Sequence, residues 1–128
     1  EQRLIGWSAK RDLAKINYHI HTSAVCCNLI PKEITQSQAN NIYAEEADVL
    51  NVALFGITAK QWREENPDSK GNIRDYASLN ELICLSNMEN INAVLINDGV
   101  PQKNRLIKLN QIAIQQMQIL ILKNKSDS

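Results

Sequence analysis

The stretch TQSQANNIYAEEADVLNVALFG, residues 35–56, decides the fold class. Thr35 and Gln38 form a T-x-x-Q capping box, in which each side chain satisfies a backbone N–H at a helix start. Apolar residues then recur every three or four positions, which is the spacing of one helical face. Gly56 fits the left-handed position that ends a helix. This stretch therefore predicts one complete, central helix with an apolar face of Ala39, Tyr43, Ala47, Leu50 and Leu54.

Two further capping boxes predict helices downstream of this one. Thr58 pairs with Gln61, and the short helix that follows must stop before Pro67, because a residue that precedes proline avoids helical angles. Ser78 pairs with Glu81 and starts a longer helix. We expect this helix to end at the Asn97-Asp98-Gly99 turn, and residues 66–72 to form a loop.

Long helices are also expected at both ends of the chain. The first runs to about Leu29 and is stopped by Pro31. The last begins at Pro101, runs to about Leu122 and leaves residues 123–128 as a frayed tail. The predicted apolar faces are Leu13, Ile16, Ile20, Ala24 and Cys27 on the first helix, and Leu106, Leu109, Ala113, Met117 and Leu120 on the last.

Together these patterns predict an all-α domain that spans residues 1–128. No segment alternates apolar and polar residues as a strand does. Short connections favour antiparallel neighbours, so we expect a compact bundle of about five helices. The first helix lacks a clear cap, so it is expected to continue from a missing upstream segment. The predicted core residues are Leu50, Leu54, Leu85, Leu95, Leu109 and Leu120.

Charge and cysteine content set limits on the class of protein. Fourteen basic and fourteen acidic residues cancel, so overall charge gives no attraction to nucleic acid or membrane. The end segments are basic and two middle segments are acidic, which fits either opposite charges packing between helices or a basic face for phosphate. Three cysteines, with no signal peptide or membrane-length apolar run, favour a reduced, cytoplasmic protein.

Three small groups of residues have side chains that could bind a metal or take part in catalysis. His19 and His21 lie about 200° apart around a helix, which does not suit a metal pair. Cys27 is expected to be a small core residue rather than half of a redox pair with Cys26. The acidic cluster of Glu45, Glu46 and Asp48 is expected on a solvated face; a metal-dependent nuclease or hydrolase built on it is the least favoured alternative.

Residues 58–76 are the candidate site, because they combine aromatic side chains with many charges. The candidate contacts for a partner or nucleic acid are Lys60, Arg63, Lys70 and Arg74. We expect Trp62 and Tyr76 to pack inward and, with Asp75, to clamp the segment, while Arg74 and Asp75 pair or point outward. A second candidate surface, for self-association, is the apolar patch of Leu4, Ile5 and Trp7.

The same segment carries a family resemblance. TAKQWREENP (58–67) and KGNIRDYA (70–77) resemble the C-terminal region of bacterial and phage KilA-N domain proteins. The similarity covers nearly the whole chain. It includes KINY (15–18), HT (21–22), ADVLNVALFG (47–56), LSN (85–87), NA (92–93) and LNQIA (109–113).

The resemblance implies an accessory domain of a phage-type DNA-binding regulator. The KilA-N domain itself is absent from this sequence, so no DNA-contacting residue is carried over. Because the sequence contains no catalytic constellation, we expect no enzyme activity and no cofactor. The expected role is interaction or oligomerisation, with the missing N-terminal DNA-binding domain and a second copy as partners and with DNA bound only through the full-length protein. Direct contact between this domain and nucleic acid is the alternative.

Overall fold

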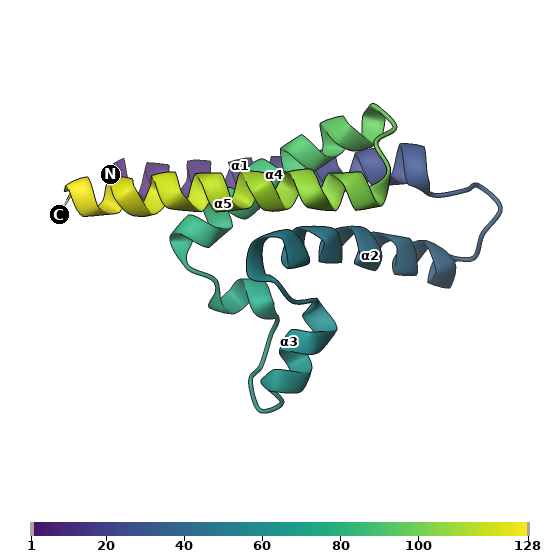
Figure 1. Cartoon of the computed structure of the whole chain (residues 1–128), viewed down its shortest axis with the longest axis horizontal. Coiled ribbons are helices and arrows are strands. Elements are labelled where there is room, and N and C mark those ends of the chain that lie inside the picture. Colours follow the sequence, from purple (N-terminus) through teal and green to yellow (C-terminus); the bar gives the residue numbers. More distant parts are fainter. Residues whose placement is uncertain (1, 128) are drawn as a thin grey trace.

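The computed structural model describes the backbone of residues 2–127 and the side chains of residues 12–123. Within this range the chain forms five α-helices, one short 3₁₀ helix and no strand, so the predicted all-α class is confirmed (Figure 1). Leu4, Ile5 and Trp7 lie outside the described side chains. The helices are α1 (Gln2–Leu29), α2 (Gln36–Phe55), α3 (Ala59–Glu65), η1 (Ile73–Tyr76), α4 (Leu79–Asn97) and α5 (Gln102–Asp127).

Capping side chains fix where the inner helices begin. The boxes predicted at Thr35, Thr58 and Ser78 are all present, with the side chain of each residue accepting a bond from the third backbone N–H of its helix. Gly56 ends α2 with a φ of 80°, as predicted for a left-handed helix end. A fourth box, at Asn72, the last residue of the expected loop, starts η1, which the sequence pattern does not predict. The last helix extends beyond the predicted end at Leu122.

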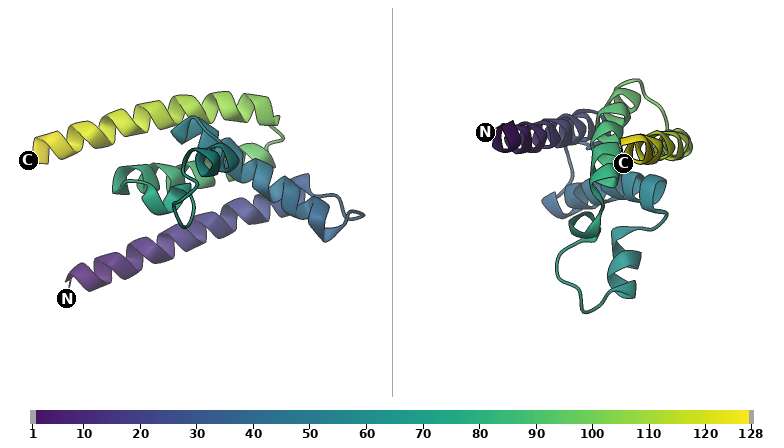
Figure 2. Two further views of the ribbon diagram at one scale, coloured as in Figure 1. Left: turned by 90° about the horizontal axis from the view of Figure 1, so that it is seen from below. Right: turned by 90° about the vertical axis from the view of Figure 1, so that its left-hand side faces the viewer.

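The helix α4 lies at the centre of the bundle. It packs between α1 and α5, whose outer ends project in the same direction beyond the start of α4 (Figure 2, left). The helix α2 packs mainly against α5 and also contacts α4 and α1. The consecutive pairs α1–α2 and α4–α5 run in opposite directions, as the short loops predict (Figure 1). The segment that holds α3 and η1 projects away from the bundle.

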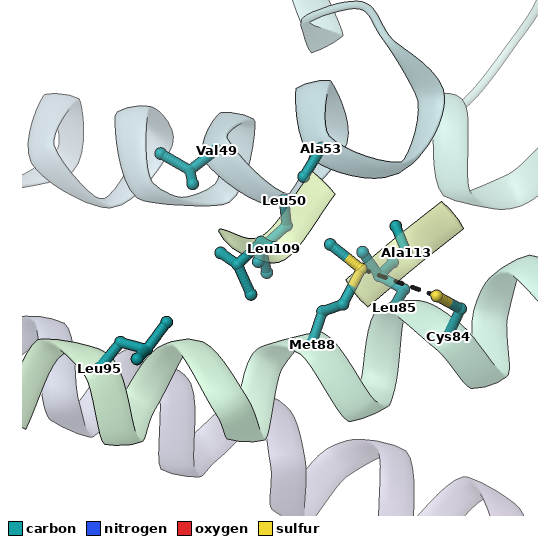
Figure 3. Close-up of a cluster of buried hydrophobic side chains, with 9 residues drawn as sticks. All are labelled: Val49, Leu50, Ala53, Cys84, Leu85, Met88, Leu95, Leu109 and Ala113. Atoms are coloured by element: carbon teal, nitrogen blue, oxygen red, sulfur yellow. Dashed lines mark hydrogen bonds between the residues drawn. The ribbon is translucent and has the colours of Figure 1, made fainter. Parts of the chain in front are cut away.

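The main hydrophobic core forms where α2, α4 and α5 meet (Figure 3). Leu50 and Leu109 are fully buried there, and Leu85 and Leu95 are buried beside them, as predicted. Leu54 and Leu120 are only partly buried and pack against the edge of this cluster. A smaller cluster between α1 and α4 holds Ala24, Val25, Ala93 and Ile96.

The predicted buried face of α1 is wrong. Leu13, Ile16 and Ile20 are 60%, 54% and 37% exposed, and Cys27 is exposed as well. The helix instead buries His21, Ala24 and Val25, so only Ala24 belongs to both the predicted and the observed face.

Polar pairs between α1 and α4 explain this rotation. Asn17 Nδ2 donates to Ser86 Oγ at 2.7 Å, and Asn28 Nδ2 donates to Asn97 Oδ1 at 2.7 Å. Between them, the buried Nδ2 of Asn92 lies 2.9 Å from Nε2 of His21. Because the polar side of α1 makes these contacts, its most regular apolar stripe faces outward.

We expect Leu50→Ala to lower the free energy of unfolding by about 2–5 kcal/mol, because the change leaves a cavity between α2, α4 and α5. Leu79→Ala is the matched control, since Leu79 is 58% exposed, and it should change stability by about 0.5 kcal/mol or less. Urea denaturation followed by circular dichroism measures both. Equal effects of the two substitutions would contradict the core described above.

Candidate functional site

The projecting segment, residues 57–77, contains every candidate partner contact, and we call it the arm. Its first end is fixed to α2 by Asp48, whose Oδ1 accepts bonds from the backbone N–H of Ala59 at 2.9 Å and from Asn51 Nδ2 at 3.0 Å. The carboxylate of Asp48 therefore adds a cap to the N-terminus of α3, next to the Thr58 capping box. Its second end is anchored by Ile73, which is buried.

The tip of the arm is closed by local contacts. Gly71 has a φ of 87°, and a side chain there would collide with the carboxylate of Asp75. That carboxylate accepts a 2.8 Å bond from the backbone N–H of Asn72. Tyr76 Oη donates to the carbonyl of Lys70 at 2.8 Å, and the rings of Tyr76 and Trp62 pack with centroids 5.3 Å apart. These contacts join the two sides of the arm, α3 and η1.

Two expectations for the arm are wrong. Tyr76 is 59% exposed, so it does not pack into the core; its ring and that of Trp62 close the arm on itself. Arg74 does not pair with Asp75, because that carboxylate caps η1. Arg74 instead reaches α4, where its Nη1 lies 3.6 Å from Glu89 Oε2. The sequence pattern does not identify Ile73 as a buried anchor of the arm. The available signal is that it is a single aliphatic residue within a polar segment.

The Arg74–Glu89 contact joins the arm to the centre of the bundle. Glu89 is 3% exposed and its Oε2 accepts no hydrogen bond. Burial raises the pKa of Glu89 above its ordinary value, and the nearby Arg74 guanidinium offsets only part of this rise. Arg74 thus supplies the positive charge that lets this carboxylate remain buried.

A cavity of about 390 Å³ lies beside this contact, between α1, η1 and α4. Its walls are mainly apolar, with the cations of Arg74 and Lys15 on its lining. The lining residues are Ala14, Lys15, Tyr18, Arg74, Leu82, Leu85, Ser86 and Glu89.

A buried polar network connects four helices elsewhere in the bundle. The guanidinium of Arg105 on α5 makes two contacts with the carboxylate of Glu46 on α2; the Nη2–Oε2 distance is 3.1 Å. Nη1 of Arg105 also donates to Asn92 Oδ1 on α4 at 3.1 Å, and Asn92 in turn contacts His21 on α1. Gln102 Nε2 donates to Glu46 Oε2 at 2.8 Å.

This network corrects one expectation. Glu46 was expected on a solvated face but is 3% exposed, and it shares the network with His21, which is 4% exposed. Burial raises the pKa of Glu46, but the hydrogen bonds from Arg105 and Gln102 outweigh it, so the net pKa is lowered. For His21, burial is the main cause that lowers the pKa to about 4. Both residues therefore hold one charge state at neutral pH: Glu46 ionised and His21 neutral.

The remaining candidate contacts of the arm are exposed and lie among acidic residues. Lys60, Arg63 and Lys70 are exposed on the arm, together with the acidic Glu64, Glu65 and Asp68. Arg105 of the basic α5 meets Glu46 of the acidic α2, and Arg74 meets Glu89 of the acidic α4. Only the Arg105–Glu46 pair joins a basic end segment to an acidic middle segment, as the interpretation of opposite charges packing between helices requires.

The other candidate groups do not gather into one site. His19 and Cys26 are exposed whereas His21 is buried, and Glu45 is exposed whereas Asp48 caps α3. Among the described residues, no three His, Cys, Asp or Glu side chains lie close enough together to hold a metal ion. No described helix contains a stretch long and apolar enough to cross a membrane. No family model, curated protein or solved structure was found to match the chain.

We predict that His21 makes stability fall between pH 6.5 and pH 4. The unfolded chain takes up a proton near pH 6.5, whereas the folded protein takes it up only near the lowered pKa of about 4. Stability therefore decreases as pH falls through this window, by about 3 kcal/mol in total. Urea denaturation at several pH values should show a smaller decrease for His21→Gln. An unchanged decrease in this variant would contradict the assignment; the exposed His19→Gln is the control.

We expect Arg74→Ala to lower the free energy of unfolding by about 1–3 kcal/mol, because it leaves the buried carboxylate of Glu89 without a cation. The estimate is below that for a fully buried pair, since Arg74 is 30% exposed and the contact is 3.6 Å long. Arg63→Ala, at an exposed position on the same arm, should have almost no effect. Adding Glu89→Gln should recover part of the loss, and thermal melting of all three variants measures this. Equal melting temperatures for Arg63→Ala and Arg74→Ala would show that the contact contributes nothing.

Proposed function

We propose that this chain is a non-catalytic accessory domain of a phage-type, cytoplasmic KilA-N regulator, and that it acts by binding other protein surfaces. Two lines support the proposal. The sequence resembles the C-terminal region of KilA-N proteins over nearly its whole length, and the bundle leaves a regular apolar stripe of α1 in solvent. The observation that supports the proposal most directly is this exposed stripe, which consists of Leu13, Ile16 and Ile20.

Exposure of the stripe to solvent is unfavourable in free energy. Complete burial of one leucine or isoleucine contributes about 2 kcal/mol. The three residues are each between 37% and 60% exposed, so a partner that covers them gains about 3 kcal/mol from the hydrophobic effect. In the sequence alone, the same spacing of apolar residues continues to Ala9 and Ile5. An extended apolar stripe of this kind marks a protein-binding surface.

The proposed partner of the stripe is the DNA-binding domain of the same polypeptide. In the KilA-N arrangement that domain precedes this one, so α1 is the element nearest to it. A covalent connection raises the effective concentration of the two surfaces, which makes a modest apolar contact sufficient. This domain would then position the DNA-binding domain without contacting DNA.

The two alternatives have weaker support. A direct nucleic-acid contact requires a continuous basic face, but Lys60, Arg63 and Lys70 alternate with acidic residues along the arm. A metal-dependent nuclease requires free carboxylates, but Glu46 is bound by Arg105 and Gln102. Tight DNA binding by this chain alone, weakening with salt and lost in Arg63→Ala, would favour the first alternative over our proposal.

We predict that the DNA-binding domain protects Ile16 from solvent in the full-length protein. Ile16→Cys, made with Cys26→Ser and Cys27→Ser, should react with a maleimide rapidly in this chain alone and at least about tenfold more slowly in the full-length protein. Cys84 does not interfere, because it is fully buried. Mass spectrometry measures the labelling rates.

Val94→Cys in the same background is the matched control. Val94 is 53% exposed on α4, close to the 54% of Ile16, and should stay reactive in both proteins. Equal rates for Ile16→Cys in the two proteins would overturn the proposed docking of α1. Protection at both positions would indicate general occlusion rather than a contact on α1, and would also contradict the proposal.

A further inference from the structure

A second apolar stripe runs along the outer side of α5. Ile107, Ile114 and Ile121 lie seven residues apart and are 53%, 54% and 45% exposed. Gln111 and Gln118 fall between them and are also exposed, so the stripe advances by four, three, four and three residues. This is the spacing of a coiled-coil seam. At about 100° per residue it lies roughly 120° around the helix from the buried stripe that contains Leu109 and Ala113.

The exposed side of α5 also lacks charge. No charged residue occurs between Lys108 and Lys123. The exposed side chains in this interval are amides and aliphatic groups, and they include Ile119 and Leu122, which are 59% and 62% exposed. A solvent-facing helical surface normally carries charges, so an uncharged seam indicates that another protein covers it.

We propose that this seam binds the α5 seam of a second copy of the chain, with the two helices parallel and in register. The inference rests on the proposed function, because it supplies the oligomerisation part of that role. The lack of charge on the seam indicates what binds there. A partner surface with charged side chains at its centre would lose the hydration of those charges and find no counterion on the seam. The α5 seam itself is a surface that meets this requirement.

The parallel direction follows from the side chains. In a parallel, in-register pair, each isoleucine packs on the same isoleucine of the second copy. Each glutamine meets its own counterpart, and two primary amides can donate to and accept from each other. In an antiparallel coiled coil, the isoleucine positions would face the glutamine positions, and buried amides would lack partners. Glutamine at alternate seam positions also restricts the register, as polar seam residues do in coiled coils.

The size of the seam sets the expected strength. Residues 107–122 form about 24 Å of helix, and a helix is about 10 Å wide. The footprint is therefore a few hundred Å², well below the roughly 800 Å² per partner of a standard stable interface. We thus expect a weak, reversible dimer.

Sedimentation equilibrium tests the proposal. The unmodified chain should dimerise with increasing concentration, and Ile114→Lys with Ile121→Lys should raise the dissociation constant at least about tenfold. Val94→Lys is the control, because Val94 is as exposed as Ile114 but lies on α4, and it should leave dimerisation unchanged. A chain that stays monomeric at millimolar concentration, or a dimer that tolerates both lysines on α5, would overturn the inference. Circular dichroism establishes that the variants fold.

Spin labels test the direction of pairing. In a Cys26→Ser, Cys27→Ser background, labels on Ile107→Cys and on Ile121→Cys, each made alone, should give a short distance between copies. In an antiparallel pair each label would lie about 21 Å along the helix axis from its counterpart, and that result would overturn the parallel arrangement. The maleimide test on α1 is independent of these measurements, so failure of α5 pairing and failure of α1 docking are distinguished.

Discussion

The buried ion pair between Arg105 and Glu46 is the constraint on which the rest of the bundle depends. The arginine is 2% exposed, so its charge has no access to water and must be satisfied by protein groups. Glu46 supplies the counterion, the carbonyl of Val100 accepts from Nε at 2.9 Å, and Asn92 accepts a further bond. Removing one member of such a pair leaves a buried charge uncompensated, which typically costs 3–5 kcal/mol. Docking of α2, α4 and α5 in any other register would leave the same uncompensated charge.

The network also determines which side of α1 faces the bundle. Asn92 is shared by Arg105 and His21, so the position of α5 is connected to the rotation of α1 through one side chain of α4. Asn17 and Asn28 add hydrogen bonds to α4 on either side of His21. With its polar side engaged in this way, α1 presents Leu13, Ile16 and Ile20 to solvent. The surface that we propose for partner binding is therefore a consequence of polar contacts in the interior.

The arm and the two apolar stripes divide the molecule into different kinds of surface. The arm is held by a cap from Asp48, an anchor at Ile73 and the Arg74–Glu89 contact, so it is a rigid projection with mixed charges. The stripes belong to α1 and α5, two helices that lie on opposite flanks of α4 (Figure 2). A domain with surfaces on both flanks can join a DNA-binding domain on one side to a second copy on the other. This arrangement is the basis on which we propose an assembling role.

The sequence by itself determined the local structure. Capping boxes at Thr35, Thr58 and Ser78, together with Gly56 at a helix end, depend on neighbouring residues only, and each lies where the sequence predicts it. The core leucines of α2, α4 and α5 were also predictable, because these helices bury the face that has the most regular apolar spacing.

Only the tertiary structure decided which faces meet and how charges are satisfied. Glu46 and Arg105 are 59 positions apart in the chain, and nothing in the local pattern shows that they approach each other. The outward rotation of α1 could not be predicted from periodicity, because spacing identifies an apolar face but not the element that covers it. The pairing of Arg74 with Glu89, rather than with the adjacent Asp75, likewise depends on tertiary packing and could not be predicted from local spacing. A long-range contact depends on how the helices pack, and that packing is fixed by the complete set of buried groups.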